Sequence, residues 1–268
     1  MRPLVAFLTD YGPGSEHVGA VHAAVAASCP QADRLDLAHD IPPGDVRWGA
    51  LVLARLAAAV PAATVVAVVD PGVGTERRGL AVVTAAGGHL VGPDNGLLGP
   101  AARALGATRA VEIDVARLPG PVAATFHGRD VFAPVAARLA AGAHPGDLGA
   151  DVDPAGIAQP SLPAPVTGPG RIEALSVGCD RFGNLALHGG AGDLRAARLA
   201  PGDPAWVHAA GHRHRARVGR VFADVPRGGM LVHVDSAGMI AIAVNGGSAV
   251  ERLGIRPGEA VGITAMEG

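Results

Sequence analysis

The hydrophobic pattern of the chain changes once, near residue 150, and this change limits the folds that the chain can adopt. From residue 3 to about residue 150, apolar runs of the β type alternate with alanine-rich segments of helical period, as in PLVAFLT, VGAVHAAVAAS, WGALVLARLAAAV, ATVVAVV and FAPVAARLAAG. Such alternation is typical of a sheet that is covered by helices. We therefore predict an α/β N-terminal domain with a central, mostly parallel sheet over residues 1–160.

The alternation stops in the segment 151–170, where prolines stand at positions 154, 160, 163, 165 and 169. A stretch this rich in proline indicates a linker. Beyond it, strand candidates such as RIEALSV, ARVGRVFADV and MIAIAV are separated by glycine turns, and no segment has a convincing helical pattern. This pattern predicts a smaller, all-β, barrel-like C-terminal domain over residues 161–268.

The basic residues exclude two kinds of chemistry. All 22 of them are arginine, so a Schiff-base lysine and a GK[ST] phosphate loop are both absent. A dinucleotide-binding loop is also disfavoured, because Arg77 stands where a third glycine would follow Gly72 and Gly74.

The remaining composition favours a small-molecule partner. A net charge of -2 and 3% aromatic residues argue against a nucleic-acid surface. No apolar run reaches the roughly 18 residues of a membrane span. Cys29 and Cys179 lie far apart with no ligand spacing around them, so we expect neither a disulfide framework nor a metal site. A cytoplasmic location is the expectation that follows.

Polar side chains follow several of the predicted strands in the first domain. They are Asp10, Asp70, Asp94 with Asn95, and His127. Open α/β folds bind ligands at the carboxyl ends of their strands, so these side chains can converge on one crevice. Each aspartate alone is explained as well by a helix cap or an Asx turn. That explanation is strongest for Asp94, in the turn sequence GPDNG, and we do not expect Asp94 to be catalytic.

The stretch VVDPGVGTERRG at 68–79 holds Asp70 and Arg77 around a glycine-rich turn. Singly, Arg77 would be an ordinary loop charge and His127 a packing residue at the start of a helix. Together, a carboxylate, a guanidinium and an imidazole offer a means of orienting and polarising a water molecule.

Several motifs, taken together, resemble one known family. They are LTDYG at 8–12, HDIPPGDVRWGA at 39–50, VVDPGVGTERRG at 68–79, VGPDNGLL at 91–98, TFHGRDVFAPVAARLAAG at 125–142, DRFGNL at 180–185 and IAVNGG at 242–247. In order and spacing they are similar to the S-adenosyl-L-methionine (SAM) hydroxide adenosyltransferase family, whose relatives include fluorinating and chlorinating enzymes. The resemblance covers nearly the whole chain.

The resemblance implies a reaction and an assembly. Activated water would attack the ribose C5' of SAM and release methionine and adenosine, so SAM is the substrate and no separate cofactor or metal is expected. Asp70, Arg77 and His127 occupy the positions of the family's water-activating triad. His127 would take or share the proton, Asp70 would fix the orientation, and Arg77 would supply positive charge. The resemblance also implies a homotrimer with the substrate between the N-terminal domain of one subunit and the C-terminal domain of its neighbour.

The same resemblance implies substrate-binding roles for five residues. Asp10 corresponds to a ligand of the ribose hydroxyls, Asp180 and Ser236 to ligands of the methionine amino group, Asn184 to an adenine contact, and Gly246 to a backbone contact. An ordinary Asx turn is the competing explanation for Asp180 and Asn184.

The chain departs from the family pattern at some positions. Ser15 replaces a common acidic residue, with Glu16 a possible substitute, and Asp235-Ser236-Ala237-Gly238 replaces Asn-Ser-Phe-Gly. Gly128 stands where the fluorinating enzyme has a halide-binding serine, and Asp70 where the halogenating enzymes have tyrosine. A carboxylate at that point should repel a halide ion.

Three alternatives to metal-free hydrolysis of SAM stay open at this point. The protein could be a halogenating enzyme that forms a 5'-halo-5'-deoxyadenosine, or a protein that binds SAM or adenosine without turnover. A metal-dependent hydrolase is the weakest of the three. It rests on GHRHR at 211–215, where His212 and His214 would share one face of a strand, although a polar surface turn explains the same letters.

Overall fold

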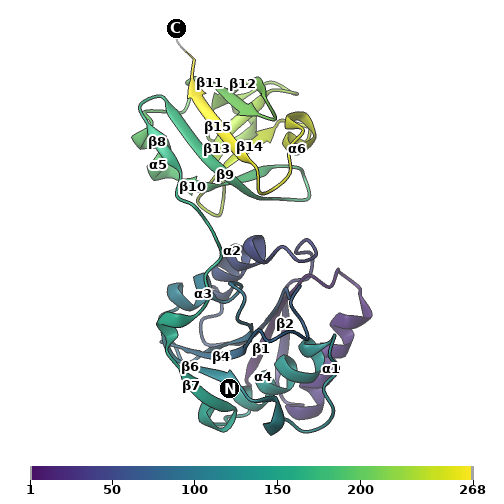
Figure 1. The fold of residues 1–268 in the computed structure, drawn as a ribbon. Coiled ribbons are helices and arrows are strands. Elements are labelled where there is room, and N and C mark those ends of the chain that lie inside the picture. Colours follow the sequence, from purple (N-terminus) through teal and green to yellow (C-terminus); the bar gives the residue numbers. More distant parts are fainter. Residues whose placement is uncertain (1, 267–268) are drawn as a thin grey trace. The chain divides into compact units, whose positions relative to one another are not determined.

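The computed structural model describes residues 2–266, and the chain divides between Ser161 and Leu162 into two compact units. Each unit has its own hydrophobic core. Figure 1 labels most of the elements of both units.

The first unit is built on a seven-stranded sheet with the strand order β2-β1-β3-β5-β4-β6-β7. Pairing is parallel from β2 to β5, and antiparallel between β5 and β4, β4 and β6, and β6 and β7. Five strands therefore point the same way, and the prediction of a mostly parallel sheet is confirmed. The strands are β1 (Leu4–Thr9), β2 (Asp33–Ala38), β3 (Thr64–Val68), β4 (Gly79–Thr84), β5 (His89–Pro93), β6 (Ala107–Ile113) and β7 (Gly149–Val152).

Helices cover both faces of this sheet because successive residues of the central strands point to opposite sides. In β1, Val5 and Phe7 pack with α1 and α4, whereas Ala6 and Leu8 pack with α2 and α3. The helices are α1 (Glu16–Ser28), α2 (Val46–Ala57), α3 (Gly99–Ala104) and α4 (Ala133–Ala140). The result is a three-layer α/β/α arrangement, with loops free at the carboxyl ends of the parallel strands.

The second unit is a closed barrel. Its strands follow the order β9-β10-β14-β13-β12-β11-β15, and β15 pairs back with β9 to close the ring, while β8 adds to the edge of β9. Alternate residues of each strand fill the interior, as expected of a small barrel. The strands are β8 (Val166–Gly168), β9 (Arg171–Cys179), β10 (Leu185–Gly190), β11 (Pro204–Ala209), β12 (His212–Val218), β13 (Met230–Val234), β14 (Met239–Val244) and β15 (Ala260–Ala265). The predicted barrel is confirmed.

The expectation that this unit has no helix was wrong. Two short helices, α5 (Ala191–Ala196) and α6 (Ala249–Leu253), connect its strands. With six and five residues they complete fewer than two turns, so neither shows a helical period in the sequence.

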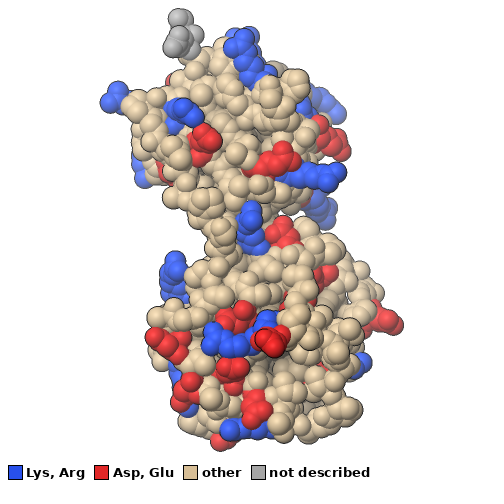
Figure 2. Space-filling view, viewed as in Figure 1, with Lys and Arg blue, Asp and Glu red and all other residues tan. Residues whose placement is uncertain are grey.

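Helix lengths and surface charge give two further observations. The longest helix, α1, has 13 residues, and no helix within residues 2–266 is long and apolar enough to cross a membrane. On the face shown in Figure 2, acidic and basic side chains are interspersed over both units.

Candidate active site

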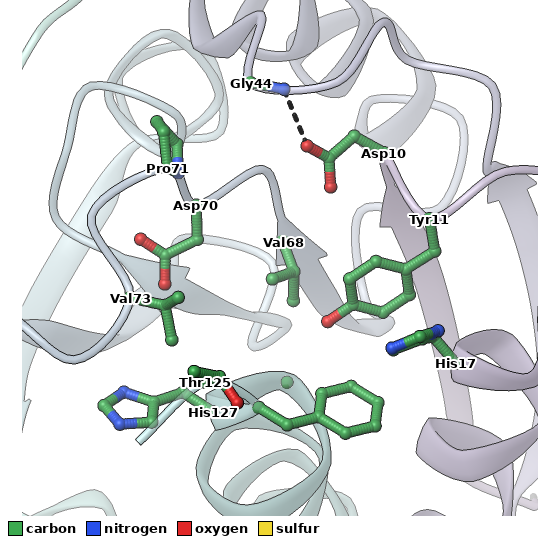
Figure 3. A pocket seen from close by; sticks show the side chains of 12 residues that line it. Asp10, Tyr11, His17, Gly44, Val68, Asp70, Pro71, Val73, Thr125 and His127 are labelled. Atoms are coloured by element: carbon green, nitrogen blue, oxygen red, sulfur yellow. Dashed lines mark hydrogen bonds between the residues drawn. The ribbon is translucent and has the colours of Figure 1, made fainter. Parts of the chain in front are cut away.

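A pocket of about 350 Å³ lies at the carboxyl ends of two neighbouring parallel strands of the first unit. Asp10 follows β1 and Asp70 follows β3, so the strand pairing brings the two carboxylates to the same edge of the sheet. Figure 3 shows both side chains at the cavity. The lining residues are Asp10, Tyr11, His17, Gly44, Val68, Asp70, Pro71, Val73, Thr125, Phe126, His127 and Gly128.

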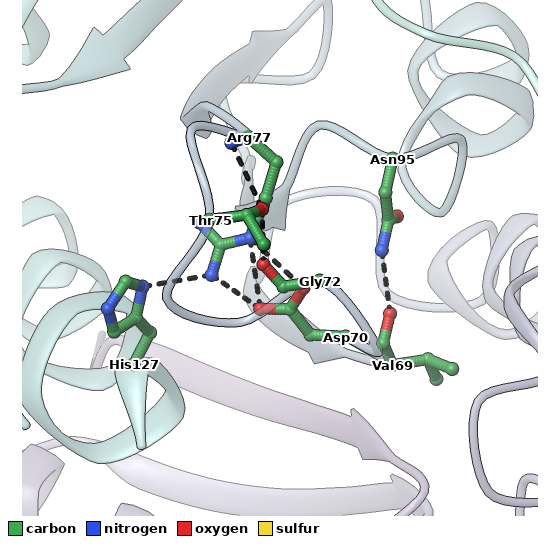
Figure 4. Close-up of polar contacts among 7 residues, drawn as sticks. All are labelled: Val69, Asp70, Gly72, Thr75, Arg77, Asn95 and His127. Atoms are coloured by element: carbon green, nitrogen blue, oxygen red, sulfur yellow. Dashed lines mark hydrogen bonds and ion pairs between the residues drawn. The ribbon is translucent and has the colours of Figure 1, made fainter. Parts of the chain in front are cut away.

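Arg77 joins Asp70 to His127 (Figure 4). Its Nε lies 3.0 Å from both carboxylate oxygens of Asp70, its Nη2 also donates to Asp70 Oδ2, and the same Nη2 lies 2.9 Å from His127 Nδ1. The side chain of Asp70 is 5% exposed and that of Arg77 12% exposed. The structure therefore brings the three residues together, with the ion pair largely buried and His127 partly exposed.

A tight turn supports this cluster. Thr75 Oγ1 donates to the carbonyl of Gly72 at 2.7 Å and accepts from the backbone N–H of Arg77 at 3.4 Å. Gly74 has φ +80°, and a Cβ there would lie 2.7 Å from the carbonyl oxygen of Ala124. The glycine lets the turn after β3 approach the segment that leads to His127.

His127 carries its proton on a defined ring nitrogen. An arginine can only donate, so Nδ1 accepts from Arg77, and a neutral His127 has its N–H at Nε2. Burial lowers the pKa of His127, and the positive charge of Arg77 lowers it further, against the opposing effect of Asp70 and Asp130. The imidazole is therefore neutral at physiological pH, and it offers a hydrogen-bond donor rather than a lone pair. In this tautomer Nδ1 is engaged by Arg77, so His127 can share a proton only through its Nε2–H.

Tyr11 is a pocket residue that the sequence analysis missed. Burial raises its pKa well above the usual range, and the negative charges of Asp10 and Asp70 add to this, so the phenol stays protonated. A Cβ on Gly128 would lie 2.0 Å from Tyr11 Oη. The phenol thus occupies the space that a side chain at position 128 would need. One signal was available, since Tyr11 is the chain's single tyrosine and directly follows Asp10.

Two polar residues near the pocket support the backbone. Asp10 Oδ2 accepts from the backbone N–H of Gly44 at 2.8 Å, which leaves Oδ1 for another partner. Ser15 caps α1 by accepting from the backbone N–H of His17, a role that accounts for this residue without a ligand. Neither Ser15 nor Glu16 lines the pocket.

The second unit carries a separate pocket of about 460 Å³. It contains two of the predicted binding residues and is lined by Phe182, Asn184, Phe222, Val244, Asn245, Gly246 and Gly247. Phe182 is 65% and Phe222 45% exposed. Exposed aromatic rings beside a hollow are typical of a binding surface, and the sequence analysis did not identify them.

The other two predicted binding residues of this unit lie in turns. Asp180 Oδ1 accepts from the backbone N–H groups of Phe182 and Asn184 at 2.9 and 3.0 Å, and Oδ2 accepts from Asn184 Nδ2 at 2.8 Å. These bonds form the Asx turn that was the competing explanation. Ser236 is exposed in the turn between β13 and β14 and does not line the pocket.

The histidines considered for a metal-dependent hydrolase lie on β12. Within residues 2–266, His212 and His214 belong to no group of three potential metal ligands. The structure instead brings His22, Asp36 and His39 together, a group that the sequence analysis missed. The spacing Asp36-x-x-His39 was the available signal.

A cluster of an imidazole and a largely buried ion pair, beside a pocket at the carboxyl ends of parallel strands, is the arrangement of an enzyme that acts on a small molecule. Residues 5–149 match the SAM hydroxide adenosyltransferase N-terminal domain, and residues 177–262 match the C-terminal domain. The chain belongs to the SAM hydroxide adenosyltransferase family.

Individual relatives agree with this assignment. An (R)-S-adenosyl-L-methionine hydrolase of Salinispora arenicola is 48% identical, with 98% of both chains covered. A crystal structure of an uncharacterized conserved protein from Thermotoga maritima superposes with a TM-score of 0.87 at 32% identity, over 97% of this chain and 99% of that one. A fluorinase of Actinoplanes sp. is more distant, at 24% identity over 98% of each chain.

Proposed function

We propose that the protein hydrolyses SAM to adenosine and L-methionine. The observation that carries this proposal is the hydrogen-bonded Asp70–Arg77–His127 cluster at the pocket, in a chain that is 48% identical to a SAM hydrolase over 98% of its length. SAM is the substrate, and the reaction needs no further cofactor.

The proposed reaction is a displacement at the ribose C5'. The oxygen of a water molecule forms a bond to C5', the C5'–S bond breaks, and its electron pair stays on sulfur, which becomes the neutral thioether of methionine. The attacking water loses one proton, so the products are adenosine, methionine and a proton. Because the sulfonium is neutralised as it leaves, the leaving group needs no acid.

The cluster would position and polarise this water. Asp70 accepts a hydrogen bond from the water and receives its proton, while the Nε2–H of His127 donates to the oxygen as negative charge develops on it. Arg77 contacts both partners, so it fixes their relative position and balances the charge of Asp70. This assigns the proton to Asp70 and a stabilising donor to His127.

Binding roles follow the residues that the two pockets supply. In the first unit, Asp10 would bind the ribose hydroxyls through Oδ1. In the second, Asn184 and the backbone at Gly246 would contact adenine between the exposed rings, and Asp180 and Ser236 would bind the amino group of methionine. An ionised carboxylate has about four acceptor sites, so Asp180 can accept from an ammonium while it holds its turn.

Each unit of the chain presents only part of such a site. We therefore include in the proposal a homotrimer in which the N-terminal domain of one subunit and the C-terminal domain of its neighbour enclose SAM. The exposed Phe182 and Phe222 support it, because a partner or ligand would cover them. A cytoplasmic location also remains a prediction.

Halogenation is disfavoured by the pocket. The buried carboxylate of Asp70 would repel a halide ion, and the phenol of Tyr11 fills the space beside Gly128 where a halide-binding side chain would stand. Incubation of the purified protein with SAM, first in halide-free buffer and then with chloride or fluoride, tests the proposal by chromatography and mass. Adenosine and methionine in every buffer are expected. A halo-nucleoside would indicate a halogenating enzyme, and SAM that is bound but unchanged would indicate a binding protein.

The pH dependence of turnover should follow the protonation of His127. Its folded pKa lies below the 6.5 of a free imidazole, so the neutral form and the activity persist above that lowered pKa. As the pH falls through it, Nδ1 gains a proton and can no longer accept from Arg77, and kcat/KM should fall. We expect the midpoint of the acid limb below pH 6.5. A midpoint above this value in the kcat/KM profile would contradict the assignment.

A further inference from the structure

Three potential metal ligands converge between α1 and the end of β2. His22 lies on α1, Asp36 on β2, and His39 directly after β2. The Nε2 atoms of His22 and His39 lie 2.7 and 3.0 Å from Asp36 Oδ1, and the three ligand atoms all lie within 4.8 Å of one another. None of these residues lines the pocket that contains Asp70.

The ring of His39 is the least ordinary member of this group. Its side chain is 8% exposed, and its Nε2 lies 3.0 Å from Asp36 Oδ1, the same oxygen that His22 Nε2 contacts at 2.7 Å. Its position opposite a carboxylate oxygen and a second imidazole nitrogen points to a cation.

We propose that His22, Asp36 and His39 form a binding site for a first-row divalent metal ion such as Zn²⁺. Two imidazoles and one carboxylate suit zinc better than magnesium or calcium, which prefer oxygen ligands throughout. A water molecule would supply the fourth ligand. Ligands of tetrahedral zinc lie roughly 3.3 Å apart, so the two imidazole nitrogens, which lie 2.7 and 3.0 Å from Asp36 Oδ1, must move away from this oxygen by about 0.3 to 0.6 Å to admit the ion. The partly exposed His22 and Asp36 can provide these shifts.

The second ring nitrogen of His39 has a hydrogen-bond partner, as is usual for a histidine that binds a metal. Its Nδ1 lies 2.8 Å from Thr9 Oγ1, and that oxygen also accepts from the backbone N–H of Tyr11. When Nδ1–H donates to Thr9, the lone pair of Nε2 faces Asp36 and His22. Most metal-bound histidines are oriented in this way, by a hydrogen bond from the ring nitrogen that does not bind the metal. The carbonyl of His39 accepts from Gly12 at 2.8 Å. A bound ion would therefore stiffen the segment from Thr9 to Gly12, which carries Asp10 into the pocket.

Titration of the metal-free, untagged protein with ZnCl₂ by calorimetry tests this site. We expect one Zn²⁺ per chain and a higher Tm with zinc than without it. Loss of a residue that only supports a metal ligand weakens metal binding by up to ~100-fold. His22→Ala removes a direct ligand, so it should weaken zinc binding by at least this factor. His22 is partly exposed on a helix, where alanine is well tolerated, so this variant should fold.

Two further variants test whether zinc binds at this group of residues. Asp36→Asn should weaken zinc binding as His22→Ala does. A variant with His212→Ala and His214→Ala removes two histidines from β12 in the other unit and should bind zinc as the parent does. No zinc binding by the parent, or binding that His22→Ala leaves unchanged, would overturn the proposal and leave a hydrogen-bonded His–Asp–His network.

Discussion

Replacement of Asp70 by asparagine should lower the turnover of SAM by ~100-fold or more, the range typical of acid-base groups. Asparagine keeps the shape of the side chain, but it removes the acceptor of the water's proton and leaves the charge of Arg77 unbalanced. A 100-fold loss corresponds to about 2.7 kcal/mol in the activation barrier. KM for SAM should change by only a few-fold, because the lost interaction acts mainly in the transition state.

Asp94 offers a matched control for this variant. Its side chain is also 5% exposed, it pairs with the neighbouring arginine through Arg78 Nε at 3.0 Å, and it does not line the pocket. Asp94→Asn should therefore keep turnover close to that of the parent. Near-parental turnover in Asp70→Asn would refute its role, and equal losses in both variants would assign the effect to disturbed folding.

Arg77→Ala should be the most destabilising of these changes. It leaves Asp70 as a buried carboxylate without its cation, and breaking a buried pair in this way costs about 3 kcal/mol or more. It also removes the guanidinium from the ring of Phe132, 5.2 Å away. For a unit of this size we expect Tm to fall by about 10 °C in thermal unfolding followed by circular dichroism. Turnover should fall with it, since His127 loses its partner.

Two further variants distinguish the effect of the unpaired, buried carboxylate on Tm from a general loss of stability. Arg109→Ala removes an arginine whose partner Asp151 is exposed, so its Tm should hardly change. The double variant Arg77→Ala with Asp70→Asn should recover part of the lost Tm, because the buried charge is gone. A Tm for Arg77→Ala equal to that of Arg109→Ala would contradict the account.

The sequence was sufficient for the layers of the fold because periodicity reports burial directly. TVVAV in β3 is buried at all five positions and lies between two parallel strands, as a continuous apolar run predicts. The short helices α5 and α6 were missed because a single turn has no period to detect. The available signals were at the ends of α6, where Ser248 accepts from the backbone N–H of Glu251 and Gly254 takes the left-handed conformation.

Details of the site depended on contacts between distant residues. Arg77 and His127 are 50 positions apart, so their spacing alone could not show that one ring nitrogen accepts from the guanidinium. That contact fixes the tautomer, and the proposed role of His127 depends on it. The contact between Tyr11 and Gly128 also joins separate elements, and so does that between His22 and Asp36. Residue types indicated the chemistry, whereas packing decided which atoms face one another.

The origin of the oxygen in the nucleoside product tests the central claim most directly. The protein should be incubated with SAM in water enriched in ¹⁸O, and the adenosine should be analysed by mass spectrometry with fragmentation of the ribose. If water attacks C5', the label appears in the 5'-hydroxyl group of every adenosine formed, whether or not halide is present. Adenosine without label at the 5' oxygen would show that the C5'–S bond is not broken by water, and the proposed role of Asp70, Arg77 and His127 would be wrong.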